Sequence, residues 1–169
     1  MEVHSRFSNP KKDFIRNEIL QLVRDVNPQK FISLPHLNFK VEQSVQGSVT
    51  CVERDKTIWT QQRQLGLPFD FKFGKLSQYV DSSFDFGWLD FCGIYTSEVT
   101  HCLKNSNFNN MVITFCAARD TLADRESFYP HYLSSHGYFP YKAIKYRVTV
   151  PMIVYFCGRE PCSLNIFQI

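Results

Sequence analysis

The sequence lacks any run of apolar residues long enough to cross a membrane. A helix needs about 20 consecutive, mostly apolar residues to span the hydrocarbon core of a bilayer, and no stretch of this 169-residue chain approaches that length. The first residues, MEVHSRFSNPKKDF, also lack an apolar core behind their basic side chains, which argues against a secretory signal. We therefore expect a protein without a membrane segment.

Cysteines at metal-binding or redox spacing are missing as well. The six cysteines include no Cys-x-x-Cys pair, so neither a zinc site nor a dithiol redox motif is expected. Cys51, Cys116 and Cys157 lie in apolar, strand-like runs, where a free thiol behaves as a small hydrophobic group. Together with the absent secretory signal, this pattern predicts free thiols in a reducing, cytoplasmic compartment.

A strong excess of one charge is absent too. The formal net charge of +3 is too small to establish a nucleic-acid partner, although it is compatible with one. With 44% hydrophobic and 21% charged residues, the chain has an ordinary globular composition and the length of one domain. We expect a single domain over residues 1–169, with residues 1–12 as a flexible N-terminal segment.

Apolar periodicity predicts that helices and strands alternate along the chain. Residues 13–26 carry an apolar stripe at helical spacing, which ends before Pro28 because the residue before a proline avoids the helical region. Further helices are expected at residues 38–46, 55–65, 97–103 and 122–133. Strands are expected at residues 30–34, 49–53, 69–73, 84–91, 111–117, 141–148 and 151–158.

The last two strands are joined so tightly that they must be antiparallel, whereas strands separated by helices pair in parallel. The sequence therefore predicts an α/β fold: a mostly parallel, doubly wound sheet with a C-terminal antiparallel β-hairpin. Lys142, Lys145 and Arg147 alternate with aromatic and apolar residues in this hairpin. We favour a lysine-protected edge strand here, while a surface that follows a phosphate backbone would show the same alternation.

Two predicted strands end on acids. Residues 84–91 are apolar apart from Asp85 and Asp90, and Gly93 lets the chain turn soon afterwards. Glu53 is likewise the last residue of the strand expected at residues 49–53. Because ligands of doubly wound sheets bind beyond the carboxyl ends of the strands, Glu53 and Asp90 are candidate site residues.

This order of elements, with about five parallel strands before an antiparallel hairpin and acids closing the second and fourth strands, resembles the class I S-adenosylmethionine-dependent methyltransferases. The resemblance covers nearly the whole chain, from about residue 14 to residue 167. It implies a Rossmann-like fold and S-adenosyl-L-methionine as the cofactor. In that family a glycine-rich loop after the first strand holds the cofactor, an acid after the second binds the ribose hydroxyls, and an acidic motif after the fourth faces the methyl acceptor.

The resemblance assigns roles to residues of this chain. Glu53, which lies 18 positions after Pro35, takes the place of the ribose acid, because a carboxylate can accept hydrogen bonds from both hydroxyls. Asp90 and Phe91 take the place of the catalytic motif, where the acid would accept hydrogen bonds from an amine and the ring would stack on a base. The implied cofactor-binding residues are Ser33, Leu34, Pro35, His36, Leu37, Glu53 and Arg54.

The chain departs from the family at the first loop. Residues 33–39 contain no glycine, where the family usually has G-x-G-x-G so that main-chain amides can approach the cofactor. A helix over residues 38–46 would still direct amides at its N-terminus toward the cofactor's carboxylate. Two functions stay open. The protein is a methyltransferase, with a nucleobase amine of a nucleic acid as the favoured acceptor, or it is a catalytically inactive binding or scaffolding protein with the same fold.

A nucleophilic cysteine is a further alternative. Cys92 and Cys116 lie near the carboxyl ends of predicted central strands, and enzymes that methylate carbon 5 of pyrimidines attack the ring with a thiolate. The Pro-Cys and Thr-Cys dipeptides of those enzymes are absent, since phenylalanine precedes both cysteines. Buried structural thiols are therefore the favoured interpretation.

Overall fold

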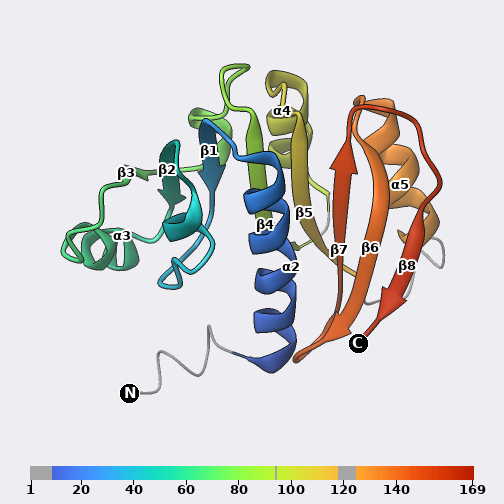
Figure 1. Ribbon diagram of the computed structural model, residues 1–169, viewed down its shortest axis with the longest axis horizontal. Helices are drawn as coiled ribbons and strands as arrows, with labels where there is room; N and C mark the ends of the chain where they lie inside the picture. The colour runs from blue at the N-terminus through green and yellow to red at the C-terminus, as the bar shows by residue number, and fades with distance from the viewer. Residues whose placement is uncertain (1–8, 94, 118–124) are drawn as a thin grey trace.

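One eight-stranded sheet runs through the molecule (Figure 1). The structure is a computed structural model, and it describes residues 9–93, 95–117 and 125–169. The strands are β1 (Lys30–Ser33), β2 (Ser48–Glu53), β3 (Asp70–Phe73), β4 (Phe86–Gly93), β5 (Asn110–Cys116), β6 (Phe139–Arg147), β7 (Pro151–Gly158) and β8 (Asn165–Gln168). The helices are α2 (Pro10–Val26), α3 (Lys56–Arg63), α4 (Ser97–Asn105) and α5 (Arg125–Ser135), with 3₁₀ turns η1 (Glu42–Ser44) and η2 (Leu76–Gln78).

The order of strands across the sheet is β3-β2-β1-β4-β5-β7-β6-β8. Strands β1 to β5 pair in parallel, and β7 pairs antiparallel with both β5 and β6. The predicted α/β fold, with a mostly parallel sheet and a C-terminal antiparallel hairpin, is therefore confirmed. The chain runs outward from β1 to β3 and then returns to β4 on the other side of β1, so the strand order reverses between β1 and β4.

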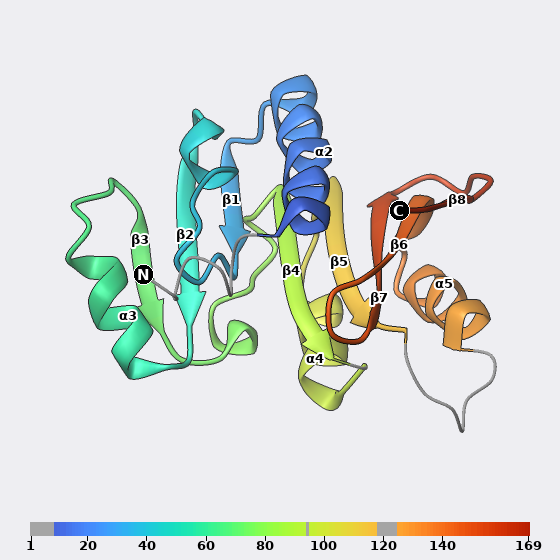
Figure 2. The same ribbon diagram turned by 90° about the horizontal axis from the view of Figure 1, so that it is seen from below.

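Helices cover both faces of the sheet (Figure 2). Helix α2 lies on one face, and α4 and α5 lie on the other. On the first face, Ile15, Ile19 and Val23 of α2 pack in a core with aromatic residues of β1 and β4. A second core joins α4 and α5 to the opposite face. The two cores explain why the central strands are apolar on both faces.

Helix α2 begins inside the segment that we expected to be flexible. The Asn9 side chain caps it by accepting a hydrogen bond of 2.9 Å from the Lys11 amide, and Pro10 occupies the first turn, where its missing N–H costs nothing. Residues 10–12 are therefore helical. The helix ends at Asn27, whose left-handed backbone (φ 47°) precedes Pro28.

Asp85, the acid directly before β4, has a structural role. Both carboxylate oxygens of Asp85 accept main-chain hydrogen bonds, one from Gln29 and one from Lys30, each at 2.9 Å. These bonds join the start of β1 to the start of β4. Asp85 therefore fixes the relative position of the two strands whose other ends form the site.

The helix predicted over residues 38–46 is wrong. Only the short turn η1 forms there. Phe39 and Val41 are both buried in the core beneath α2, although residues two apart point to nearly opposite sides of an α-helix. Burial of both side chains in one core therefore favours the irregular conformation of this segment over a continuous helix.

The interpretation of the lysine-rich hairpin strand as a sheet edge is also wrong. Strand β8, which the sequence analysis missed, pairs in parallel with β6, so β6 lies inside the sheet. The Lys142 ammonium forms a 3.0 Å ion pair with Glu18 of α2 and lies over the ring of Phe156. Lys142 thus fastens α2 to the sheet.

None of the helices in the described part of the chain combines the length and the apolar character that a bilayer-spanning helix needs.

Candidate functional site

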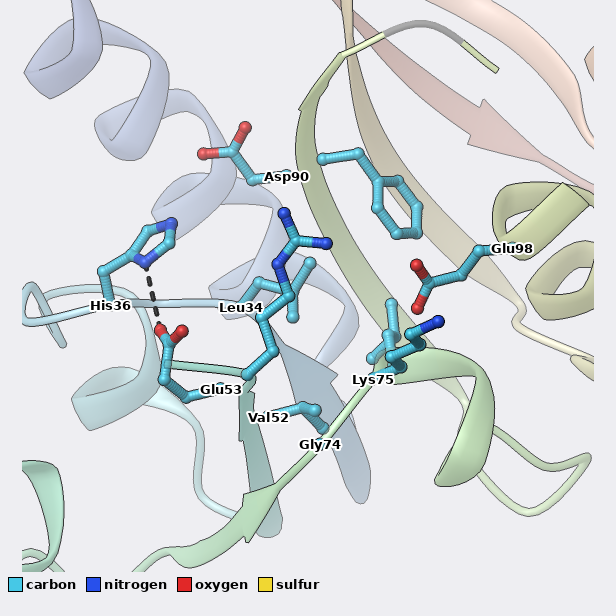
Figure 3. A pocket seen from close by; sticks show the side chains of 11 residues that line it. Leu34, His36, Val52, Glu53, Gly74, Lys75, Asp90 and Glu98 are labelled. Atoms are coloured by element: carbon cyan, nitrogen blue, oxygen red, sulfur yellow. Dashed lines mark hydrogen bonds and ion pairs between the residues drawn. The ribbon is translucent and has the colours of Figure 1, made fainter. Parts of the chain in front are cut away.

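A cavity of about 210 Å³ opens at the carboxyl ends of the parallel strands, where the strand order reverses (Figure 3). Glu53 from the end of β2 and Asp90 from β4 both line it. The predicted convergence of these two carboxylates on a shared cavity is therefore present in the structure. Leu34 and His36, from the turn after β1, line the same cavity, as does Arg54.

The lining combines apolar walls with a few charged groups. Leu34, Val52, Leu76 and Phe91 supply the apolar part, and the charged groups are Glu53, Arg54, Lys75, Asp90 and Glu98. Mixed linings of this kind are typical of small-molecule sites, in which apolar walls hold a ligand and polar groups orient it. A shallower hollow adjoins the cavity, and the two share Arg54, Gly74 and Lys75 in their linings. Asp55 and Gln78 complete the lining of the hollow.

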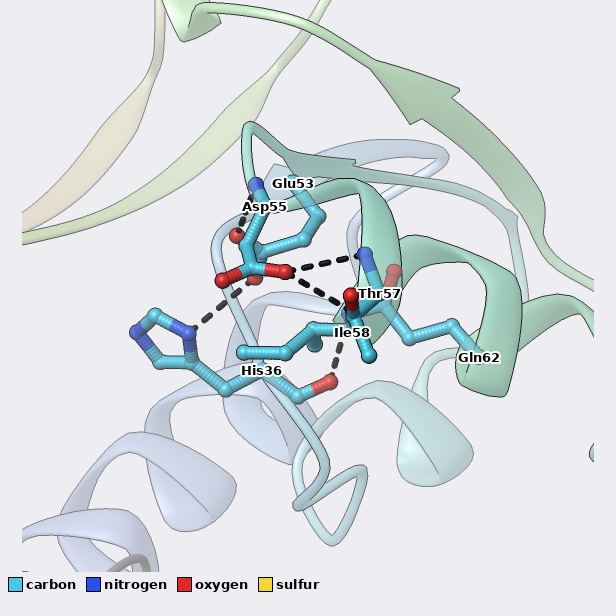
Figure 4. A network of polar contacts seen from close by, with 6 residues as sticks. All are labelled: His36, Glu53, Asp55, Thr57, Ile58 and Gln62. Carbon is cyan, nitrogen blue, oxygen red and sulfur yellow. Dashed lines mark hydrogen bonds and ion pairs between the residues drawn. The ribbon is translucent and has the colours of Figure 1, made fainter.

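Glu53 is held in place by hydrogen bonds to both of its oxygens (Figure 4). Its Oε2 lies 3.1 Å from Nδ1 of His36, and its Oε1 accepts a bond of 2.9 Å from the Asp55 amide. Asp55 in turn caps α3 by accepting bonds from the amides of Thr57 and Ile58. Burial alone would raise the pKa of Glu53, but these hydrogen bonds outweigh it and hold that pKa below its usual value. The carboxylate is therefore ionised and rigid.

His36 lies at the turn where the resembled family has glycines. Its backbone is left-handed, with φ at 55°, a conformation that suits glycine better than a residue with a Cβ. Its carbonyl oxygen accepts a 2.5 Å hydrogen bond from the buried Gln62 side chain, and its ring contacts Glu53. Contacts to both its backbone and its side chain therefore hold His36 in this conformation.

Three of the predicted cofactor-binding residues do not line the cavity: Ser33, Pro35 and Leu37. Ser33 is fully buried, and its hydroxyl donates a 2.8 Å hydrogen bond to Glu42 on the side of α2. Because no helix follows β1 directly, the expectation that a helix N-terminus presents amides at this turn is wrong. The remaining predicted residues, Leu34, His36, Glu53 and Arg54, do line the cavity.

The segment after β3 completes one wall. The Gly74 amide donates a 3.0 Å hydrogen bond to the Glu53 carbonyl, which brings this segment against the end of β2. Gly74 has a φ of 139°, and a Cβ there would lie 2.2 Å from the Gln78 side chain, so only glycine suits this turn. Lys75 follows it into the cavity lining. Glu98, on the first turn of α4, was not predicted, because nothing in its sequence context marks it.

A bulge in β4 follows Asp90. Asp90 pairs with Thr114 of β5, but the next paired residue is Gly93, opposite Phe115. Phe91 and Cys92 are thus extra residues in the strand, and such bulges re-aim side chains at the ends of strands. Asp90 also lines a second, water-sized pocket beneath α2, whereas Phe91 packs against the core on the side of α4. Because successive residues of a strand point to opposite faces, the acid and the ring lie in different directions at the rim.

The thiol alternative gains no geometric support. Cys116 is half-buried and packs against the core beneath α2, and the side chain of Cys92 lies outside the described part of the structure. Burial raises the pKa of Cys102 to about 12 and raises those of Cys51 and Cys157 still further, so these three thiols stay protonated. Among the described residues, no group of three or more histidine, cysteine or acidic side chains is placed to hold a metal ion.

The architecture matches that of solved methyltransferases. Magnesium protoporphyrin IX methyltransferase from Synechocystis PCC 6803, solved with bound S-adenosylmethionine, superposes with a TM-score of 0.68 at 13% identity, covering 89% of this chain and 80% of its own. The N-methyltransferase NodS from Bradyrhizobium japonicum WM9 gives 0.63 at 10% identity, covering 90% and 99%. The ribosomal protein L11 methylase from Lactobacillus delbrueckii subsp. bulgaricus gives 0.64 at 11% identity, covering 90% and 80%.

No protein-family model matches the sequence, and a comparison with curated proteins finds no match. The likeness to the solved methyltransferases is therefore one of structure at low sequence identity. It confirms the predicted methyltransferase-like, Rossmann-like fold.

Proposed function

We propose that the cavity binds S-adenosyl-L-methionine and that the protein transfers the methyl group of this cofactor to a nucleophilic acceptor. The acceptor that we favour is an exocyclic amine of a nucleobase in a nucleic acid. The observation that carries this proposal is the convergence of Glu53 and Asp90 on one cavity at the reversal of strand order. Doubly wound sheets bind their ligands at this position. The structural likeness to methyltransferases supports the same proposal.

The residues present fit the chemistry of this cofactor. Glu53 is suited to the ribose hydroxyls, because each of its oxygens has a lone pair beyond the one bond that it already accepts. Asp90 and Glu98 add negative charge that suits a sulfonium cation, and Arg54 and Lys75 suit the carboxylate of its amino-acid part. The cavity is smaller than the roughly 300–1,000 Å³ that is usual for such ligands, but the adjoining hollow of about 670 Å³ extends it.

The protein's own contribution to the reaction would be alignment and electrostatics. The bound cofactor supplies an activated methyl group on a sulfonium. Asp90 would accept a hydrogen bond from the acceptor amine and so direct the amine's lone pair into the cavity, while Phe91 would stack on the base. A carboxylate beside the amine also stabilises the positive charge that develops on the nitrogen.

The test separates binding from transfer. We expect Glu53→Ala to weaken binding of S-adenosylhomocysteine at least tenfold in calorimetry, because the ribose hydroxyls lose a charged acceptor. Asp90→Ala should abolish transfer of labelled methyl groups to single-stranded oligonucleotides while changing binding less than threefold. Asp70→Ala, at an exposed acid of β3 outside the cavity, is the matched control. Unchanged turnover in the Asp90 variant would refute the catalytic assignment.

A second candidate, a binding or scaffolding protein without catalysis, is favoured by one specific observation. His36 already contacts the carboxylate proposed to bind ribose, at a turn that has no glycine. A ligand that binds only the folded state raises the melting temperature. No thermal shift with millimolar S-adenosylmethionine or S-adenosylhomocysteine would therefore favour this second candidate over the first.

A further inference from the structure

The outer edge of β8 differs in composition from a normal sheet edge. Within the described residues β8 pairs with β6 alone and ends the sheet on the side opposite β3 (Figure 1). Exposed edge strands usually carry charges, a proline or a bulge, which prevent another strand from pairing with them. Residues 165–169 read Asn-Ile-Phe-Gln-Ile, with no charged side chain and no proline, and Ile166 and Phe167 are each 53% exposed.

The opposite edge of the same sheet shows the usual protection. Strand β3 carries Asp70 and Lys72, whose side chains form a 3.4 Å ion pair. Helix α3 packs beside it, and the Trp59 indole donates a 3.1 Å hydrogen bond to the Phe71 carbonyl. The two edges therefore differ, and the apolar character of β8 is not a general property of edges in this protein.

The hydrogen-bond register fixes which groups of β8 face outward. The Ile169 amide donates a 3.0 Å bond to the Lys145 carbonyl of β6. Since successive residues of a strand direct their main-chain groups to alternate sides, Phe167 also faces β6, and Ile166 and Gln168 direct their N–H and C=O groups to the open edge. A further strand can bond only to these outward groups.

We propose that a second copy of this chain pairs with this edge, β8 against β8, antiparallel about a two-fold axis through Phe167. In this register the outward groups of Ile166 in one copy bond to those of Gln168 in the other, and symmetry repeats the exchange. Phe167 then lies directly opposite Phe167 of the second copy. The two sheets become one continuous sheet.

The side chains suit this self-pairing. A two-fold axis brings identical residues together, so any charge near it would meet its own copy, and β8 has none. Phe167 is paired with Ile144 in the sheet, and Ile144 belongs to the core beneath α2, so the aromatic pair extends that core across the interface. An aromatic pair is favourable in cross-strand positions. Because so short a strand pair buries little area, we expect association to depend on concentration.

Sedimentation equilibrium over a wide range of concentration tests the proposal. The unmodified protein should form dimers at concentrations on the order of 100 µM, and Phe167→Lys should weaken dimerisation at least tenfold, because two ammonium groups would meet at the axis. Phe73→Lys, at a 43% exposed aromatic residue of the other edge strand, should change nothing. A protein that stays monomeric throughout, or a dimer that survives Phe167→Lys, overturns the proposal. Loss of association in Phe73→Lys would indicate head-to-tail pairing of β8 with β3, which also overturns it.

Cysteine cross-linking tests the register without relying on a charged substitution. Directly opposed residues of a non-hydrogen-bonded pair have Cα atoms about 4.5 Å apart, within reach of a disulfide. In a Cys162→Ser background, which removes an exposed thiol, Phe167→Cys should form a disulfide-linked dimer under mild oxidation. Ile166→Cys should not, because it faces Gln168 of the other copy. Equal cross-linking of both variants, or of neither, contradicts the proposed axis.

Discussion

At the scale of single residues, the contact between His36 and Glu53 bears most directly on the proposed binding of a ribose. Histidine adopts the left-handed backbone that glycine would adopt more easily, and contacts to Glu53 and Gln62 stabilise it there. The cost of this conformation for a residue with a Cβ is about 1–2 kcal/mol. The contact of the His36 ring with Glu53 offsets part of this cost. The ring also competes with any ligand hydroxyl for a hydrogen bond to Glu53 Oε2.

Replacement of His36 by glycine should therefore increase affinity. We expect His36→Gly to tighten binding of S-adenosylhomocysteine about three- to tenfold, because the variant removes the competing contact and relieves the backbone strain. Leu37→Gly adds similar flexibility to the same turn without touching Glu53, and it should not tighten binding. Isothermal titration calorimetry measures both. Unchanged or weaker binding in the His36 variant would show that the ring supports the ligand instead of competing with it.

Glu42 is a buried acid outside the cavity. It is fully buried, and Ser33 donates a hydrogen bond to its Oε2, while no partner within the described structure binds its Oε1. Burial raises the pKa of Glu42 to about 7, against which the Ser33 hydroxyl and the nearby Arg16 act only partly. The folded state therefore holds a proton that the unfolded state releases at lower pH.

The stability of the protein should consequently fall as the pH rises from about 5 to about 8. A carboxyl whose pKa is raised by folding contributes its full stability below the unfolded-state value, and this contribution is lost as the pH passes the folded-state value. The loss is at most about 3 kcal/mol. Urea unfolding at about pH 5 and about pH 8 measures this fall in stability. Glu42→Gln should remove most of it, whereas Glu160→Gln, at an exposed position, should leave it unchanged. Equal slopes in all three proteins would contradict the assignment.

At the scale of secondary-structure elements, β4 positions the site. Asp85 anchors its start to β1, and a bulge follows Asp90 at its end. Between them, Gly87 lets the ring of Phe108 pack directly against the strand, since a Cβ at Gly87 would lie 2.5 Å from that ring. Strand β4 therefore depends on a glycine for packing along its length, while hydrogen bonds to Asp85 hold its start.

Gly87→Ala should destabilise the protein by about 1–3 kcal/mol, the usual cost of overpacking a core. Gly158→Ala is the matched control, because a Cβ at this glycine of β7 would meet no atom within 4 Å. Urea unfolding at constant pH measures both. Phe108→Leu should offset part of the loss when combined with Gly87→Ala, since the smaller side chain leaves room for the methyl group. A Gly87 variant as stable as the Gly158 variant would show that Phe108 shifts without cost.

At the scale of the whole molecule, the cavity and the open edge lie far apart in the strand order. The cavity lies over β1, β2, β3 and β4, and β8 is separated from β4 by β5, β7 and β6. The sheet connects the two regions, but they share no residue. Association through β8 should thus leave the cavity accessible.

We therefore expect the two regions to act independently. Phe167→Lys should change the affinity for S-adenosylhomocysteine less than twofold while it weakens dimerisation at least tenfold, because energetic effects of distant sites with no shared partners usually add. Calorimetry below and above the dimerisation range checks this. An affinity that rises or falls with protein concentration in the unmodified protein, and is constant in the variant, would show instead that the two regions are coupled.

The sequence by itself determined the order and type of most elements. Strong local signals sufficed there: apolar runs, the cap residue before α4, and the short connection of β6 to β7. From parallel pairing alone it also followed that Glu53 and Asp90 both lie at the carboxyl ends of the strands, on the same side of the molecule. Those features need only neighbouring residues and general rules of chain topology.

Other features were decided only by tertiary structure. The contact of His36 with Glu53, the entry of Glu98 into the cavity and the direction of Ser33 toward Glu42 each join residues whose local sequences carry no sign of the partner. Burial of Phe39 and Val41 against α2 outweighed the helical tendency of their segment, and pairing with β6 made a strand of residues 165–168. In each case the stabilising energy comes from a surface that exists only once the chain is folded, so no local pattern records it.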